Sequence, residues 1–95
     1  MNKSDLIARV AAATGRPKSE TEATIGTALE IIAQSLAAEQ DVSLFEFGAF
    51  RLVHRHAQPG RKINGKTYDV PARTTVRFKP HAALLKRLPV APERL

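Results

Sequence analysis

The basic segment from Arg51 to Lys79 constrains the fold of this 95-residue chain more than any other feature. It contains eight lysines and arginines against one acid, Asp69. Asn64-Gly65 lies near its middle, and this dipeptide is the strongest short-range signal for a β-hairpin. A long hairpin with so much charge and so few large apolar side chains cannot bury itself. We therefore expect an arm that projects from the protein and binds an anionic partner.

Charge is divided unevenly along the chain. Residues 1–50 contain four basic and seven acidic residues, whereas residues 51–88 contain ten basic residues and one acidic residue. The two segments carry net charges of −3 and +9 within a total of +6. A cationic face kept only for solubility would not require this segregation, so the pattern favours nucleic acid or another anionic surface as the partner.

The segment before the arm has helical periodicity. Asn2 is a typical N-cap, Asp5 suits the third helical position, and Gly15 is a natural stop. Pro17 suits the first turn of a second helix, which we expect to run to about Glu39. The chain therefore opens with two helices.

After these helices the period changes to that of strands. Val42–Phe45 predicts a short strand, and Gly48 predicts a bend or bulge. The last predicted element is a short helix over Ala82–Leu88, which Pro89 ends. Four phenylalanines are interpreted as core residues: Phe45, Phe47, Phe50 and Phe78.

Few residues remain for a core once the arm is set aside. A domain of this size is marginal, and the chain has no cysteine to form a disulfide. We therefore expect oligomerisation to supply stability. No stretch predicts a signal peptide or a membrane span, so the sequence predicts a soluble cytosolic protein with no membrane partner.

Two turns at Asn64-Gly65 give different pairings along the arm. A two-residue turn pairs Ile63 with Lys66 and sends Phe50 and Phe78 to opposite faces. A three-residue loop that includes Ile63 makes one face apolar at the base of the arm, so binary patterning favours it. That register pairs Phe50 with Phe78, Leu52 with Val76, Arg51 with Arg77, Arg55 with Arg73, Arg61 with Thr67, and Lys62 with Lys66. Facing arginines destabilise a sheet unless a polyanion supplies counter-charge, so we expect the free arm to be mobile.

Residues 1–88 resemble the HU / integration host factor family of bacterial histone-like DNA-bending proteins. The matching segments are Asn2-Lys3-Ser4-Asp5-Leu6-Ile7, Ala28-Leu29-Glu30, Phe47-Gly48-Ala49-Phe50, Gly60-Arg61, Pro71-Ala72 and Phe78-Lys79-Pro80. The resemblance implies an α+β fold that forms an intertwined dimer. It has two N-terminal helices, a three-stranded antiparallel sheet with an extended β-hairpin arm at about residues 51–79, and a short C-terminal helix. Residues 89–95 would then form a tail.

The resemblance implies that two arms embrace double-stranded DNA through the minor groove. The predicted DNA-binding residues are Lys3, Arg51, Arg55, Arg61, Lys62, Ile63, Lys66, Arg73, Arg77, Lys79, Lys86 and Arg87. Family members carry a proline at the arm tip that wedges between base pairs. Counted from the N-terminal side, Ile63 takes its position in a tip one residue shorter. Ile63 either acts as the apolar wedge or only shapes the loop.

The chain also departs from the family outside the tip. His81-Ala82 and Leu85 stand where relatives often carry glycine and lysines, and Val53 and Gln58 stand where relatives often carry arginine. These departures imply fewer or shifted phosphate contacts.

The leading interpretation is sequence-tolerant binding and bending of double-stranded DNA by a nucleoid-associated homodimer. One alternative is a subunit of a site-specific heterodimer, towards which Arg73 and the Phe78-Lys79-Pro80 segment lean. Another is a scaffold dimer whose arms bind RNA or an acidic protein, although A-form RNA hides its deep groove and exposes a shallow one, which suits an arm with an apolar wedge poorly.

Catalysis is not expected, because no nucleophile–base pair is evident, and we expect neither a cofactor nor a small-molecule substrate. His54 and His56 share a face but lack a third ligand for a metal. They are interpreted as polar partners at the arm base or as pH-dependent DNA contacts.

Overall fold

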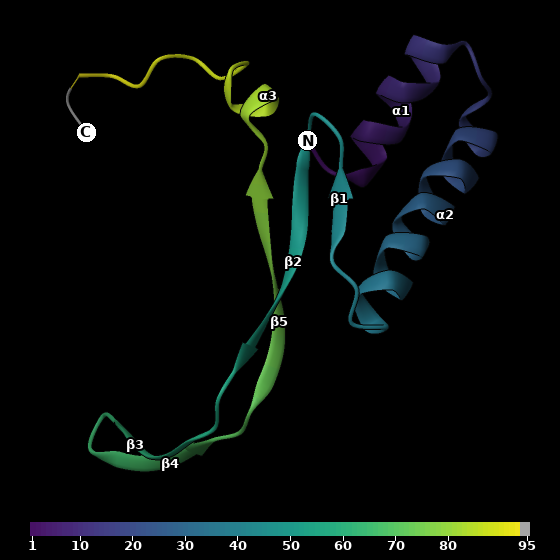
Figure 1. Cartoon of the computed structure of the whole chain (residues 1–95). Coiled ribbons are helices and arrows are strands. Elements are labelled where there is room, and N and C mark those ends of the chain that lie inside the picture. The colour runs from purple at the N-terminus through teal and green to yellow at the C-terminus, as the bar shows by residue number, and fades with distance from the viewer. Residues whose placement is uncertain (94–95) are drawn as a thin grey trace. The chain divides into compact units, whose positions relative to one another are not determined.

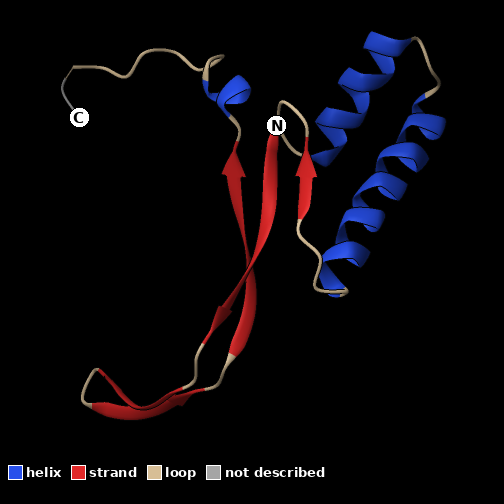
Figure 2. Ribbon diagram, in the orientation of Figure 1, coloured by secondary structure: helices blue, strands red, loops and turns tan. Residues whose placement is uncertain are grey.

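The computed structural model describes residues 1–93, apart from the side chain of Arg61, and divides the chain into two units. Met1–Ala38 form a helical unit, and the second unit, from Glu39 onward, consists mainly of β-strands (Figure 1, Figure 2). The elements are α1 (Lys3–Thr14), α2 (Lys18–Ala37), β1 (Val42–Leu44), β2 (Gly48–Arg55), β3 (Gln58–Ile63), β4 (Lys66–Val70), β5 (Arg73–Pro80) and α3 (Ala82–Leu85).

Helix α1 has the ends that its sequence predicts. The Asn2 side chain accepts a hydrogen bond from the Asp5 N–H at 2.9 Å, and the Asp5 carboxylate accepts one from the Asn2 N–H at 3.1 Å. This reciprocal capping box satisfies two backbone donors that the helix itself leaves unpaired. At the other end Gly15 adopts a left-handed φ of 71° and donates to the Ala11 carbonyl at 2.9 Å. Both predicted boundaries are confirmed.

Helix α2 begins one residue later than predicted. Pro17 is its N-cap, with φ of −57°, instead of a member of the first turn. The helix ends at Ala37, because Glu39 has a φ of 59° that no α-helix can accommodate. Neither α1 nor α2, nor the shorter α3, is long and apolar enough to span a membrane.

The three-stranded antiparallel sheet has the order β1-β2-β5. Gly48 is not the bulge that its sequence suggested, since it pairs regularly with both Leu44 and Pro80. Glycine is required here for steric reasons, because a Cβ would lie 2.6 Å from Cε1 of Phe78 and 2.9 Å from the Lys79 carbonyl oxygen. Glycine at this position therefore lets an aromatic ring lie directly against the strand.

Three of the four phenylalanines cluster at the base of the sheet. The Phe78 ring lies 5.3 Å from Phe50 and 5.7 Å from Phe47 between centroids, in tilted arrangements that favour aromatic contact. Phe45 is different, because its side chain is 89% exposed and it lies in the turn between β1 and β2. Phe47 and Phe78 touch other aromatic rings but are still 47% and 39% exposed, and Phe50 is half-buried. Within a single chain the prediction that all four are core residues is therefore wrong for Phe45 and is not met by Phe47 or Phe78.

A single chain buries very little apolar surface. Ile7 and Ala49 are the buried apolar residues of the described chain, at 6% and 2% exposure. Many large apolar side chains remain partly or largely open to water: Met1, Leu29, Ile31, Leu44, Phe45, Phe47, Ile63, Tyr68, Val76, Phe78, Leu85, Leu88 and Val90. So much exposed apolar surface is unusual for a stable monomer, and it agrees with the expected oligomerisation.

The last helix is shorter than predicted. Helix α3 ends at Leu85, and the backbone then tightens, with N–H groups of Arg87 and Leu88 donating to carbonyls three residues earlier at 3.0 and 3.1 Å. This tighter hydrogen bonding is common where a helix ends. The α-helix therefore ends at Leu85, and only the tighter hydrogen-bonded turn that follows it reaches the predicted end at Leu88.

Candidate nucleic-acid interface

The base of the arm is the regular ladder between β2 and β5. Its register pairs Phe50 with Phe78, Leu52 with Val76, Arg51 with Arg77, and Arg55 with Arg73. All four predicted pairs are confirmed. Because side chains alternate between faces, one face of this ribbon carries the phenylalanines and the other carries the arginines.

Five predicted cations share the second face, and we call it the cation face. They are exposed and comprise Arg51, Arg55, Arg73, Arg77 and Lys79. Arg51 has an acidic neighbour, since its guanidinium lies 3.8 Å from the Asp41 carboxylate. The same carboxylate accepts a hydrogen bond from the Leu52 N–H at 2.9 Å, which fixes it beside β2. Both partners of the ion pair are about half exposed, so it contributes little and can exchange for another anion.

The tip of the arm differs from its predicted register. Asn64 and Gly65 have φ of 53° and 77°, as a two-residue type I′ turn requires, and Ile63 pairs directly with Lys66. Lys62 therefore faces Thr67, not Lys66. Arg61 pairs with Tyr68, not Thr67, and its side chain lies outside the described residues.

A β-bulge allows the two-residue turn at the tip and the Phe50–Phe78 register at the base to occur in the same arm. The pairing shifts by one residue between Gln58 and Arg61, where Pro59 and Gly60 together oppose Asp69. Gly60 has a left-handed φ of 70°, and its N–H donates to the Asp69 carboxylate at 2.9 Å. The predicted three-residue loop that includes Ile63 is therefore wrong, because the extra residue lies in the bulge and not in the turn. Proline followed by glycine within a strand was the available signal for a bulge.

The arm changes direction where both of its strands are interrupted. Residues 56–57 separate β2 from β3, residues 71–72 separate β4 from β5, and the β3–β4 ribbon runs at a marked angle to the base (Figure 1). A hollow of about 380 Å³ lies at this point. It is lined by His54, Arg55, His56, Ala72, Arg73 and Thr74. The facing arginines make it cationic.

His54 has polar partners at the arm base, as one of its two interpretations predicts. Its Nδ1 lies 2.9 Å from the Thr74 hydroxyl, and its Nε2 lies 3.9 Å from the Glu39 carboxylate. No group of three potential metal ligands occurs among the described residues. The two facing arginines in the lining of the hollow, Arg55 and Arg73, favour an anion there.

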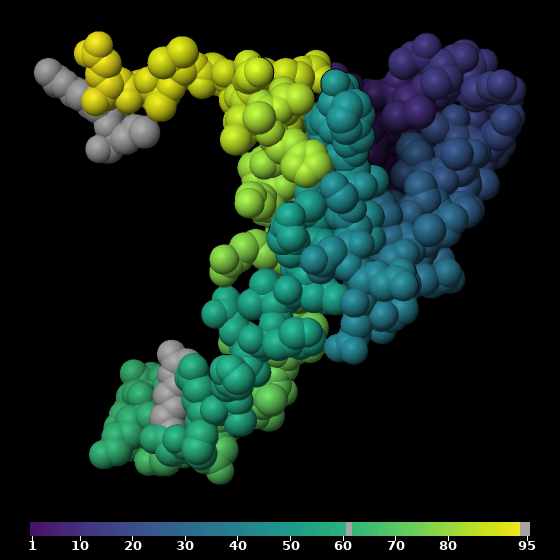
Figure 3. All heavy atoms as spheres, in the orientation of Figure 1, coloured from purple at the N-terminus to yellow at the C-terminus, as the bar shows by residue number. Residues whose placement is uncertain are grey.

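The other predicted cations are spread over the chain. Lys62 and Lys66 are exposed at the tip, which lies at the end of the arm opposite α3 (Figure 3). Lys86 and Arg87 are exposed just after α3, and Lys3 is exposed at the start of α1 in the helical unit. Exposure leaves each of these side chains accessible to an anionic partner.

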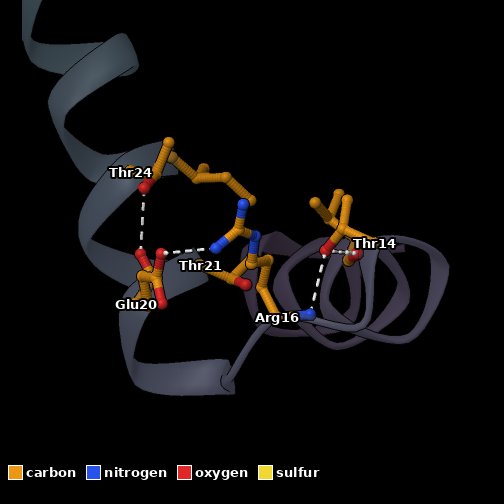
Figure 4. Close-up of a pocket in the computed structure, with 7 residues that line it drawn as sticks. Thr14, Arg16, Glu20, Thr21 and Thr24 are labelled. Carbon is orange, nitrogen blue, oxygen red and sulfur yellow. Dashed lines mark hydrogen bonds and ion pairs between the residues drawn. The ribbon is translucent and has the colours of Figure 1, made fainter.

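A second hollow, between α1 and α2, offers no comparable site. It has a volume of about 240 Å³ and contains the Arg16–Glu20 ion pair at 3.7 Å (Figure 4). The hydroxyls of Thr14, Thr21 and Thr24 donate to nearby backbone carbonyls. Its one cation is already paired, so the arm remains the better candidate.

Comparison with known proteins gives consistent matches. A family model described as "Bacterial DNA-binding protein" matches residues 1–89. DNA-binding protein HU of Staphylococcus aureus is 39% identical over 85 residues, which cover 88% of this chain and 94% of that protein. DNA-binding protein HRL53 of Rhizobium leguminosarum is 33% identical over 85 residues, covering 88% and 93%.

Solved structures give the same result. The HU–DNA cocrystal structure from Anabaena aligns with a TM-score of 0.82 at 27% identity, covering 92% of this chain and 96% of that chain. HU from Thermotoga maritima aligns with a TM-score of 0.66 at 30% identity, covering 92% and 97%. The likeness therefore extends over nearly the whole of each chain, arm included.

Proposed function

The chain belongs to the bacterial DNA-binding protein family, and on that premise we propose that it is a histone-like protein that binds and bends double-stranded DNA with little sequence specificity. Its β-arms would enter the minor groove, as apolar and basic arms of architectural proteins do. Its place would be on the nucleoid in the cytoplasm, and its role structural instead of enzymatic.

The observation that carries this proposal is the cation face of the arm. Arg51 lies opposite Arg77, and Arg55 lies opposite Arg73. Like charges directly opposite each other destabilise a sheet, so this arrangement costs stability unless an anion lies across it. A phosphate backbone supplies that anion, and arginine binds phosphate oxygens in pairs. The face thus matches the chemistry of a nucleic acid better than that of a neutral partner.

We assign the DNA contacts to two groups of residues. The cations would neutralise phosphates, and Ile63, which is 45% exposed at the tip, would be the wedge that enters a base step. The proposed DNA-contacting residues are Lys3, Arg51, Arg55, Arg61, Lys62, Ile63, Lys66, Arg73, Arg77, Lys79, Lys86 and Arg87. Unstacking one step costs on the order of a few kcal/mol, which the added contacts along the bent duplex would offset.

A dimer is part of the proposal. The apolar residues that one chain leaves open, such as Ile31 at 56% and Leu88 at 58% exposure, give a second chain surface to cover. We propose a homodimer in which residues 1–88 form the DNA-binding domain and each chain contributes one arm.

Salt dependence and competition test this function. A labelled duplex titrated with the full-length protein should bind with an affinity that falls linearly with salt on a log–log plot, by about 0.9 for each phosphate contacted. Duplex RNA of the same sequence should compete poorly, because the minor groove of A-form RNA is wide and shallow and does not enclose an arm with an apolar wedge. An affinity that ignores salt, or equal competition by duplex RNA, would contradict the proposal.

A further inference from the structure

The β3–β4 tip has two apolar side chains on one face. Ile63 pairs with Lys66, and Tyr68 follows Lys66 by two residues on the same strand. Side chains alternate along a strand, so Tyr68 points to the same side as Ile63, while Thr67 points to the other. Ile63 and Tyr68 are therefore diagonal neighbours, a spacing of about 7–8 Å that aromatic side chains can bridge.

Tyr68 lies outside the aromatic cluster at the base of the arm. Its side chain is 48% exposed, close to the 45% of Ile63. The aromatic contacts of the described chain join Phe47, Phe50 and Phe78 at the base, and the tyrosine ring takes part in neither. A tyrosine on a strand can simply reflect β-propensity. However, this ring shares its face with the proposed wedge, at the end of an arm flanked by lysines.

The bulge holds the backbone next to this ring. Asp69 follows Tyr68, and its carboxylate accepts the Gly60 N–H at 2.9 Å across the arm. Asp69 is the only acid among the residues from 51 to 88, where its negative charge opposes the binding of a polyanion. The hydrogen bond to Gly60 gives this acid a structural role, which is to fix the backbone beside Tyr68.

We propose that Tyr68 is a second base-contacting residue of the arm, which stacks on a base left exposed when Ile63 enters a base step. This inference rests on the proposed DNA binding and names the part of the DNA that the tip contacts. Every base has a π-face, so stacking on a tyrosine ring is tolerant of sequence. The matching ligand is a duplex at a weakly stacked step, or one that contains an unpaired base.

The composition of the chain makes this contact directly observable. Tyr68 is the single tyrosine and the chain has no tryptophan, so its emission reports on the arm tip alone. Full-length protein would be titrated with a paired duplex and with the same duplex carrying one unpaired base, and binding would be followed separately by anisotropy of labelled DNA. We expect tyrosine emission to fall on binding, and to fall further with the unpaired base. Unchanged emission at saturating DNA would overturn the inference.

Three variants separate the ring from the bulk of the side chain. Tyr68→Leu keeps an apolar side chain without a ring, and should lose roughly five- to tenfold in affinity for the duplex with the unpaired base. Tyr68→Phe keeps the ring and should stay within about twofold of the wild type. Thr67→Ala, on the opposite face, is the matched control and should change neither affinity.

The outcomes distinguish this inference from the proposed function. If Tyr68→Leu binds both duplexes as the wild type does, the stacking role is wrong while DNA binding stands. If the wild type itself binds neither duplex, the proposed function is wrong.

Discussion

The base and the tip of one hairpin are held by different forces. At the base, β2 and β5 form an uninterrupted ladder of eight pairs, and Phe78 packs against Phe47 and Phe50. At the tip, β3 and β4 are short, and their order comes from the Asn64-Gly65 turn and from the Asp69–Gly60 hydrogen bond. Side-chain packing therefore stabilises the base, whereas a tight turn and a hydrogen bond to the backbone stabilise the tip.

This difference assigns different tasks to the two regions. A packed base can hold the arginines at fixed spacing, so it suits contacts to a regular phosphate backbone. A tip with exposed Ile63 and Tyr68 and few packing contacts can adapt to a deformed base step. Substitutions at the base should therefore change folding or electrostatics, while substitutions at the tip should change how DNA is deformed.

The most damaging test of the base is Gly48→Ala. The added methyl group would lie within 2.6 Å of the Phe78 ring and 2.9 Å of the Lys79 carbonyl, so ring or strand must move. We expect a loss of about 3 kcal/mol in unfolding free energy, measured by urea denaturation at fixed protein concentration. Gly26→Ala in α2 is the matched control, since its Cβ would meet nothing within 4 Å, and it should not destabilise. Equal stability of the two variants would refute the packed base.

Neutralising the facing pair at the cationic hollow should affect binding rather than folding. In the double variant Arg55→Gln/Arg73→Gln, relief of repulsion should leave stability unchanged or higher. Affinity for a duplex at low salt should fall roughly tenfold, and the salt slope should shrink by about 0.9 for each phosphate that the variant no longer neutralises. The control is Arg16→Gln, whose side chain pairs with Glu20 in the helical unit. A slope equal to that of the wild type would remove these arginines from the interface.

At the tip, Asp69→Asn should show separately how the Asp69 carboxylate affects backbone order at the bulge and how its negative charge affects DNA binding. The variant weakens the hydrogen bond that holds the bulge, so the Gly60 amide should exchange about fivefold faster with solvent, while global stability stays nearly constant. Duplex affinity should nevertheless rise, because a negative charge is removed from the arm. Hydrogen exchange followed by NMR and a parallel DNA titration give both readouts. Slower exchange, or weaker binding, would show that the carboxylate has another role.

The smallest expected effect is at the turn between β1 and β2. Glu46 has a φ of 60°, which costs a residue with a Cβ about 1–2 kcal/mol. Glu46→Gly should therefore stabilise the fold by about 0.5–1 kcal/mol, the relief being reduced by the greater freedom of glycine in the unfolded chain. Glu46→Ala removes the carboxylate but keeps the strain. Stabilisation by alanine as large as that by glycine would point to charge instead of backbone strain.

The sequence predicted the base of the arm better than the tip, and the reason is physical. At the base, alternation of apolar and charged residues favoured one register, which pairs Phe50 with Phe78, and the structure has this register. At the tip no such alternation exists. One strand of the arm is one residue longer than the other, and the sequence allows this extra residue to lie either in the turn or in a bulge. The choice depended on Gly60 adopting a left-handed φ, which composition alone does not settle.

The roles of Gly48 and Tyr68 were also difficult to predict from the sequence. Gly48 was interpreted as a bend or bulge, but it forms no bulge and instead leaves room for the Phe78 ring. Gly48 and Phe78 are far apart in the sequence, so no local pattern encodes their contact. Tyr68 was overlooked because charge dominated the arm, although it was the one aromatic residue within the hairpin beyond the phenylalanines at its base. Local capping signals, as at Asn2 and Gly15, were reliable because both partners lie within four residues.

The central claim, that the base holds DNA while the tip kinks it, is tested most directly by the end-to-end distance of a doubly labelled duplex. Energy transfer would be measured at saturating wild-type protein, with Ile63→Ala, and with Arg55→Gln/Arg73→Gln. We predict that the wild type shortens the distance, that Ile63→Ala binds but leaves the duplex straighter, and that the arginine variant needs more protein yet reaches the same bend. A wild-type protein that leaves the distance unchanged, or an Ile63→Ala variant that bends DNA fully, would contradict the account.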